Sequence, residues 1–120
     1  MAGAKILVVE DEFLIRLMLC EALADEGFEA IEAGDGQEAV EAMNSHPDVA
    51  LLLTDMQLPG SITGVEVARR ARETTPAIPV IFVTGGPNAP SGPASPHEAF
   101  ITKPYLPSDV CATVRRMIGG

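Results

Sequence analysis

Cysteine, basic residues and long apolar runs are all scarce in this sequence. The two cysteines, Cys20 and Cys111, lack the close spacing of metal ligands and sit in apolar surroundings, which favours a reduced intracellular thiol pair over a disulfide framework. Only 8 Lys and Arg stand against 17 Asp and Glu, and the net charge of −9 repels a phosphate backbone and suits a cation. The apolar runs at residues 6–9 and 50–53 are far too short to span a membrane. We therefore expect a cytoplasmic protein with no membrane insertion and no direct nucleic-acid contact.

The composition that remains is typical of a globular protein. Of the 120 residues, 47% are hydrophobic and 21% charged, and there is no low-complexity tract, which excludes a disordered or fibrous chain. A chain of this length buries roughly two-thirds of its unfolded surface without a disulfide or metal to hold it. The sequence predicts one domain over residues 1–120.

Strand-like and helix-like segments alternate along the chain. Continuous β-branched apolar runs, as at residues 5–9, are typical of strands buried on both faces of a parallel sheet, and apolar residues at helical spacing follow them. Strands are predicted at residues 5–9, 28–33, 48–54, 78–83 and 99–102, and helices at 12–26, 37–44, 65–74 and from 107 onward. This alternation predicts a doubly wound α/β fold whose site lies at the carboxyl ends of the strands.

One stretch departs from this alternation. Prolines at positions 87, 90, 93 and 96 exclude an α-helix, whose interior each proline destabilises by about 3 kcal/mol. We expect residues 86–98 to take extended or turn conformations and to be the most mobile part of the domain apart from its termini. A segment of this kind, joined directly to Thr84, could order or disorder when the domain is modified, or serve only as a connection.

Polar side chains follow four of the predicted strands. In chain order they are Glu10, Asp11 and Glu12, then Asp55, then Thr84, then Lys103. Each alone fits an ordinary role as a helix cap, a turn hydroxyl or a surface charge. Because the carboxyl ends of parallel strands meet at one edge of the sheet, their joint arrival there indicates a functional site.

The residues around these positions carry a resemblance to a known family. The motifs are Val8-Val-Glu-Asp-Glu12, Leu53-Thr-Asp-Met-Gln-Leu-Pro-Gly60, Val83-Thr84-Gly85 and Phe100-Ile-Thr-Lys-Pro104. With them the whole chain resembles the receiver domains of two-component response regulators, and within that family it is similar to stand-alone or hybrid-kinase receivers. The resemblance implies a flavodoxin-like, five-stranded parallel sheet of order 2-1-3-4-5 and a cis Lys103–Pro104 bond. The proline-rich stretch predicts that the family's fourth helix is degenerate or absent.

The resemblance also implies the roles of the site residues. Asp55 is the expected phosphoacceptor in a phosphorelay, Thr84 and Lys103 are the expected hydroxyl and lysine, and Glu10 with Asp11 forms the acid pair. The implied partner is a histidine kinase or a histidine phosphotransfer protein. A domain of this kind catalyses only its own phosphorylation and dephosphorylation.

The crowded carboxylates have a chemistry of their own. Asp55 beside Glu10 and Asp11 needs a hard divalent cation, and Mg²⁺ prefers oxygen ligands in an octahedron. We expect Mg²⁺ to be held by Asp11, Asp55 and the backbone carbonyl of Gln57, with Glu10 bound through water. Lys103 and Thr84 would stabilise the transferring group from the other side.

Three other interpretations remain open from the residues. An aspartyl phosphatase usually has a second Asp two residues after the nucleophile, where this chain has Gln57. A flavin-binding module needs a hydroxyl-rich phosphate loop after the first strand, where this chain is acidic. A degenerate receiver that serves as a scaffold would not need all five site residues.

Two sets of apolar residues lie near the expected site. Phe13, Leu14, Ile15 and Met18 are more apolar residues than one core-facing stripe can bury, so some should be exposed beside Asp55 as a kinase-docking patch or packed under neighbouring loops. Phe100 takes the place of the residue whose side chain reorients with Thr84 in the family, although a phenylalanine there also fits core packing.

Overall fold

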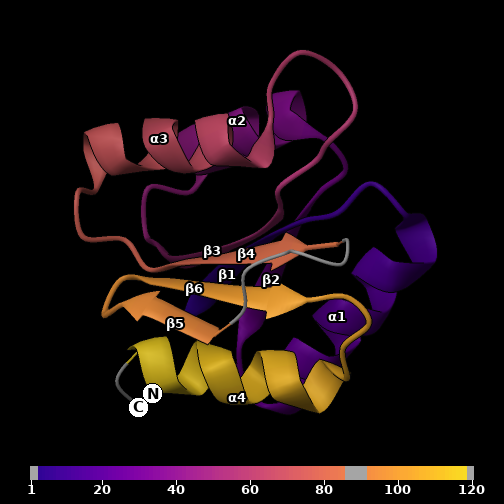
Figure 1. The fold of residues 1–120 in the computed structure, drawn as a ribbon. Helices are drawn as coiled ribbons and strands as arrows, with labels where there is room; N and C mark the ends of the chain where they lie inside the picture. The colour runs from indigo at the N-terminus through magenta and orange to yellow at the C-terminus, as the bar shows by residue number, and fades with distance from the viewer. Residues whose placement is uncertain (1–2, 86–91, 119–120) are drawn as a thin grey trace.

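The fold is described by a computed structural model, which covers residues 3–85 and 92–118. Within those residues the chain forms ten elements in the order β1, α1, β2, α2, β3, α3, β4, β5, β6, α4 (Figure 1). The strands are β1 (Lys5–Val9), β2 (Glu29–Ala33), β3 (Val49–Asp55), β4 (Val80–Thr84), β5 (Gly92–Ser95) and β6 (Glu98–Thr102), and the helices are α1 (Phe13–Asp25), α2 (Gly36–Ser45), α3 (Gly64–Thr74) and α4 (Pro107–Ile118). None of these helices is long and apolar enough to cross a membrane.

The strands form one sheet with the order β2-β1-β3-β4-β6-β5. The first five in that order pair in parallel, so the predicted five-stranded arrangement 2-1-3-4-5 is confirmed, with β6 in the fifth position. The sequence analysis did not predict β5, which pairs antiparallel with β6 through residues such as Gly92 opposite Phe100. An edge strand needs hydrogen bonds on one side only, and for that reason it tolerates Pro93.

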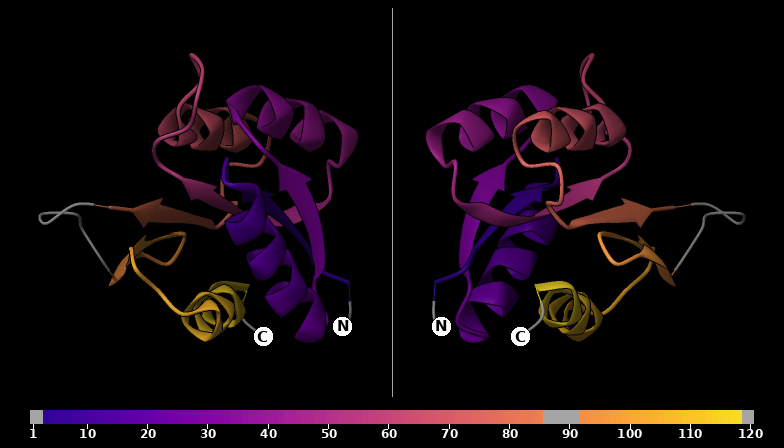
Figure 2. Two further views of the ribbon diagram at one scale, coloured as in Figure 1. Left: turned by 90° about the vertical axis from the view of Figure 1, so that its right-hand side faces the viewer. Right: turned by 90° about the vertical axis from the view of Figure 1, so that its left-hand side faces the viewer.

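Two helices cover each face of the sheet. The turned views in Figure 2 show α2 and α3 together on one side and α1 and α4 together on the other, in agreement with their packing. The α1–α4 side encloses a core that includes Ile6, Leu23, Leu51 and Val114. The α2–α3 side encloses a second core formed by alternate residues of the same strands, such as Leu7 and Leu52. Strands buried on both faces explain the continuous apolar runs.

Between β4 and β6, the described residues contain a strand and a turn and no helix. Residues 92–98 therefore agree with the expected extended or turn conformations, and the predicted loss of the fourth helix is confirmed over this part. Residues 86–91 lie outside the described residues, and the predicted mobility of residues 86–98 stays a prediction.

Side chains that bind backbone N–H groups set two helix starts. The Glu38 N–H donates to Asp35 Oδ1 at 2.8 Å, and the Glu66 N–H donates to Thr63 Oγ1 at 3.1 Å. Because these caps precede the first helical turn, α2 and α3 begin at Gly36 and Gly64, one residue before the predicted starts. Both caps lie at the same edge of the sheet as the carboxyl ends of β1 and β3.

Candidate functional site

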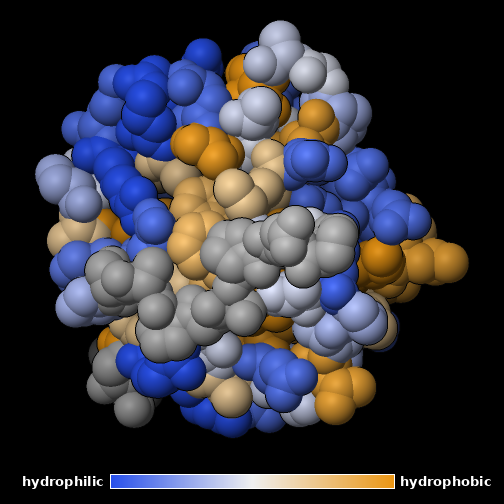
Figure 3. Space-filling model, in the orientation of Figure 1, coloured by the Kyte–Doolittle hydropathy of each residue, from blue (hydrophilic) through white to orange (hydrophobic). Residues whose placement is uncertain are grey.

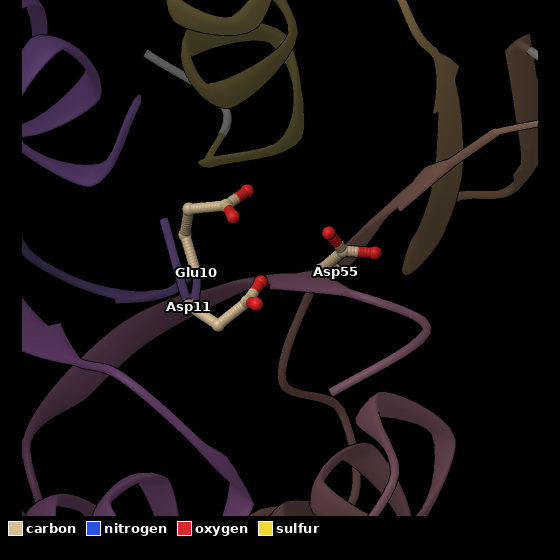
Figure 4. A group of neighbouring side chains, drawn as sticks. All are labelled: Glu10, Asp11 and Asp55. Atoms are coloured by element: carbon tan, nitrogen blue, oxygen red, sulfur yellow. The ribbon is translucent and has the colours of Figure 1, made fainter. Parts of the chain in front are cut away.

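Three carboxylates meet at the carboxyl edge of the sheet. Glu10 and Asp11 follow the end of β1, and Asp55 is the last residue of β3, which pairs with β1. One oxygen from each of the three lies within 4.8 Å of the others, and Figure 4 shows the Glu10 and Asp11 side chains extending toward Asp55. Glu10 and Asp55 are 2% and 7% exposed, whereas Asp11 is exposed. The fold therefore holds two buried acids beside one that faces solvent.

Lys103 brings a positive charge to this cluster from β6. It follows the last residue of that strand, and its Nζ donates to Asp55 Oδ2 at 2.7 Å. The Lys103 N–H donates to the Thr84 carbonyl at 2.7 Å, and the Lys103–Pro104 peptide bond is cis, as expected. Partial burial would lower the pKa of Lys103, but the hydrogen bond and charge of Asp55, with the charges of Glu10 and Glu12, outweigh burial and raise it. Lys103 is therefore a cation beside Asp55.

The second oxygen of Asp55 is bound by backbone. Gln57 donates its N–H to Asp55 Oδ1 at 3.2 Å, so both carboxylate oxygens have a donor. Thr84, the last residue of β4, is buried and lines the same open pocket of about 480 Å³ as Asp11, Asp55, Gln57 and Lys103. The structure thus brings every predicted site residue to one place.

Glu10 is the most buried member of the cluster. Its Oε2 accepts the N–H of Glu12 at 3.0 Å. Burial raises the pKa of Glu10 and the charge of Asp55 adds to the rise, while the Glu12 N–H and Lys103 oppose it. Without a cation, this carboxylate is therefore held in a costly charged state.

The sequence analysis did not single out three residues near this site, and two of them, Gly64 and Arg16, support its geometry. Gly64, the first residue of α3, is buried so closely that a Cβ there would lie 1.9 Å from the Asp55 carbonyl oxygen. Arg16 Nη1 donates to the Glu10 carbonyl at 2.8 Å. The Tyr105 hydroxyl is buried, and it has no hydrogen-bond partner in the described part of the chain. No local sequence pattern marks the contacts of Gly64 and Arg16 or the burial of the Tyr105 hydroxyl.

Phe100 packs in the core on the α2–α3 side of the sheet. Its ring stacks on that of Phe82 at 5.5 Å between centroids and 25° between planes. This contact agrees with the packing interpretation, and the expected reorientation of Phe100 with Thr84 stays a prediction.

The donor set suits a hard cation with an anionic group beside it. Three carboxylates with one oxygen each at close range are the ligands that Mg²⁺ prefers, and the pocket opens to solvent at Asp11. Lys103 and Thr84 line the same pocket, and an ammonium and a hydroxyl are the kinds of donor that an oxyanion would need. This arrangement of carboxylates, lysine and hydroxyl suits a divalent cation and an anionic group in one pocket.

Comparison with known proteins gives the same family from three directions. A family model described as the response regulator receiver domain matches residues 6–115. The phosphate regulon transcriptional regulatory protein PhoB of Pseudomonas aeruginosa is 36% identical over 98% of this chain, which spans 53% of that protein. The response regulator receiver protein CpdR of Brucella abortus is 32% identical over 95% of this chain and 96% of its own length.

The fold comparison agrees. The crystal structure of a response regulator receiver protein from Sinorhizobium medicae matches with a TM-score of 0.86 and 24% identity, over 98% of this chain and 96% of that one. The family acts in phosphorelay signalling, is phosphorylated on aspartate and binds Mg²⁺ at an acidic pocket, which here corresponds to the cluster of Glu10, Asp11 and Asp55. With its sheet order, its acidic cluster and the match over residues 6–115, the chain belongs to the receiver domain family of two-component response regulators.

Proposed function

We propose that residues 1–120 form one receiver domain that accepts a phosphoryl group on Asp55 from a phosphohistidine of a histidine kinase or a histidine phosphotransfer protein. The observation that carries this proposal is the position of Asp55, which ends a central strand within reach of two other carboxylates and 2.7 Å from Lys103 Nζ. In the part of the chain that the structure describes, no other carboxylate is grouped in this way with acids and a lysine.

The transfer is a displacement at phosphorus. An oxygen of the ionised Asp55 carboxylate forms a bond to phosphorus, the bond between phosphorus and the partner's imidazole nitrogen breaks, and its electron pair stays on that nitrogen. Lys103, held as a cation by Asp55, lies where it can pair with the phosphoryl oxygens. Thr84 supplies a hydroxyl from the end of the neighbouring strand. No general base is needed, because the nucleophile is already an anion.

The acid side of the pocket would hold Mg²⁺. Asp11, Asp55 and the Gln57 carbonyl are the proposed direct ligands, and Glu10 the ligand through water. When bound, the cation neutralises the carboxylates and the charge on the phosphoryl oxygens. Burial of Glu10 and the exposure of Asp11 support this division, because Asp11 can contact an ion that arrives from solvent. Removal of the phosphoryl group by water in the same pocket would make the domain a catalyst of its own phosphorylation and dephosphorylation only.

The partner would dock on the apolar start of α1. Phe13 is 59% exposed and Leu14 74%, and Leu106, in the loop before α4, is 64% exposed. Figure 3 shows apolar surface at the right of the molecule, where α1 begins in Figure 1. Beside it Ile15 and Met18 line a pocket of about 370 Å³ with Lys103, so an apolar surface reaches the phosphorylation site. A phosphotransfer helix that covers this surface would bring its histidine to Asp55.

The charge of the chain supports a protein partner. The net charge of −9 disfavours contact of this domain with a nucleic-acid backbone and favours a protein partner, for which we propose action in the cytoplasm. The Pseudomonas aeruginosa relative is a transcriptional regulatory protein, and this chain spans 53% of its length.

Intact-mass measurement after incubation with Mg²⁺ and acetyl phosphate tests the proposal. The expected result is a mass gain of one phosphoryl group in the wild type, none without Mg²⁺ and none in Asp55→Asn. Asp109→Asn, at the start of α4, is the matched control because it removes one carboxylate outside the acidic cluster, and it should gain mass as the wild type does. Phosphorylation of Asp55→Asn in undiminished yield would contradict the assignment.

A further inference from the structure

Arg16 joins the acid pair to the neighbouring strand without touching the pocket. It lies in the first turns of α1, and its side chain is only 17% exposed although it begins on the surface of the helix. Its Nη1 donates to the Glu10 carbonyl at 2.8 Å and its Nε to Glu32 Oε1 at 3.0 Å. Glu32 belongs to β2, so a single guanidinium connects α1, the residue after β1, and the second strand.

The surroundings of this guanidinium are closely fitted. A Cβ at position 34 would lie 3.2 Å from Arg16 Nη1, so the side chain lies against the backbone just after β2. The Glu10 N–H donates to the Ala33 carbonyl at 3.0 Å, and the Glu10 carbonyl accepts from Arg16, so both backbone polar groups of Glu10 are bound. The Phe13 ring lies 5.5 Å from the guanidinium carbon and adds a cation–π contact. The backbone of Glu10 is thus held from β2 and from α1 at once.

The turn formed by Glu10 and Asp11 needs contacts that fix its conformation. Its Glu10 and Asp11 carboxylates lie within 4.8 Å of Asp55, and like charges at such range repel. Repulsion favours a turn that swings its acids toward solvent and apart from Asp55. A cation bonded to the turn's own carbonyl opposes that movement, and the planar guanidinium does so at a defined angle because its two bonds go to two different elements.

We propose that Arg16 is a positioning residue for the Mg²⁺ site, which holds the turn of Glu10 and Asp11 in the conformation that binds the ion. The inference rests on the Mg²⁺ site of the proposed function. Arg16 is not a ligand. It acts through the Glu10 carbonyl, in the way that outer hydrogen bonds orient metal ligands, where their loss commonly weakens metal affinity by about 10- to 100-fold.

If Arg16 contributed only its charge, removing it would change the Mg²⁺ affinity in the opposite direction, which makes the inference testable. Removing a positive charge next to a cation site strengthens Mg²⁺ binding if charge is all that Arg16 contributes. Removing a positioning contact weakens it. Arg16→Met keeps most of the aliphatic stem and loses every donor, and Arg16→Lys keeps the charge but has one ammonium in place of the two bonds of the fork.

The experiment measures the Mg²⁺ dissociation constant by titration calorimetry of the unphosphorylated chain, at temperatures where each variant is folded by circular dichroism. We expect binding about tenfold weaker in Arg16→Met and about threefold weaker in Arg16→Lys. Arg115→Ala is the matched control, because it removes an arginine paired with Glu26 at the far end of α1, and it should bind as the wild type does. Unchanged or tighter binding in a folded Arg16→Met would overturn the inference. If Arg16→Met does not fold, Arg16→Lys decides, and unchanged affinity there would overturn it.

Asp11→Ala separates this inference from the proposed function. A wild type that binds no Mg²⁺, or an Asp11→Ala variant that binds it fully, would remove the Mg²⁺ site itself. In a different outcome, the wild type binds Mg²⁺, Asp11→Ala does not and Arg16→Met binds it normally. That result would contradict only the role of Arg16 and would leave the Mg²⁺ site in place.

Discussion

Replacing Gly64 by alanine should both destabilise the domain and slow its phosphorylation. Gly64 is the first residue of α3 and packs directly on Asp55, the proposed phosphoacceptor, since a Cβ there would lie 1.9 Å from the Asp55 carbonyl oxygen and 3.0 Å from the Met56 Cα. The Gly64 N–H also donates to the Met56 carbonyl at 3.0 Å, so the start of α3 is tied to the residue after Asp55. The Asp55 carbonyl is itself held in place, because its oxygen accepts a hydrogen bond from Thr54 Oγ1 at 2.8 Å.

The displacement follows from these distances. Real Cβ atoms essentially never approach within 3.0 Å, so the Asp55 peptide and the start of α3 must separate by about 1.1 Å. Overpacking of this kind destabilises by about 1–3 kcal/mol, and contact with backbone places it at the upper end. A loss of about 3 kcal/mol lowers the melting temperature of a domain of this size by on the order of 10 °C. A movement of about 1 Å at a reacting group slows a reaction by about 100-fold.

Two other glycines serve as controls for Gly64→Ala. A Cβ on Gly36 would lie 2.5 Å from the Ile62 carbonyl oxygen, so Gly36→Ala should destabilise comparably without moving Asp55. A Cβ on Gly85 would meet no atom of the described residues within 4 Å, so Gly85→Ala should leave the melting temperature unchanged. Thermal melts and the rate of acetyl-phosphate labelling are measured for all three. Wild-type melting and labelling in Gly64→Ala, or equal slowing in Gly36→Ala, would refute the reasoning.

The remaining predictions concern four residues of the site and its surroundings. Mg²⁺ should raise the melting temperature of the wild type and not of Asp11→Ala, and an equal rise in both would contradict the ligand assignment. Tyr105→Phe should stabilise the fold by about 1 kcal/mol in urea unfolding, because it removes a buried hydroxyl that has no partner among residues 3–85 and 92–118, and a loss of stability would show that the hydroxyl is satisfied. Burial raises the pKa of Glu10 above its ordinary value of 4.5, so the protonated side chain stabilises the fold fully below that pH, and this stabilisation is lost as the pH rises through the raised pKa. Glu10→Gln should therefore flatten the pH dependence of the unfolding free energy measured without Mg²⁺. If the pH dependence is the same in Glu10→Gln, Glu10 is not its source. Leu14→Ser, at a side chain 74% exposed, should slow transfer from a phosphohistidine protein and spare acetyl-phosphate labelling, whereas equal loss in both would indicate damaged folding.

The sequence predicted the parallel sheet because its central strands, β1, β3 and β4, are buried on both faces. Runs such as residues 5–9 and 49–55 have no polar side to confuse their assignment, and the structure gives β1 and β3 nearly the predicted bounds. The β5 strand was missed for the opposite reason. Its sequence Gly-Pro-Ala-Ser has no β-branched or aromatic residue, and it is a strand because it pairs with β6, which local pattern does not reveal.

For the candidate site, too, the sequence predicts some features and misses others. The positions of Glu10, Asp55, Thr84 and Lys103 follow from a rule of topology, since residues after parallel strands collect at one edge. The contacts that fix those side chains depend on distances between elements far apart in the chain. The link from Arg16 to Glu32 joins a helix to a strand across the sheet edge, and no local pattern of residue types marks it.

The ion pair of Asp55 and Lys103 connects the proposed chemistry to the proposed docking surface. Lys103 Nζ donates to one Asp55 oxygen and the Gln57 N–H to the other, so phosphorylation at either oxygen would place the phosphoryl group beside one of these donors. Whichever oxygen reacts, the phosphoryl group carries a charge of nearly −2 beside the Lys103 ammonium, so Lys103 follows the new charge. Lys103 is continuous with Pro104 and Tyr105, which line the same pocket as Met18 of α1. A change in the position of Lys103 on phosphorylation would therefore change one wall of the apolar pocket that the partner would contact, and we expect the unphosphorylated and phosphorylated forms to present different docking surfaces.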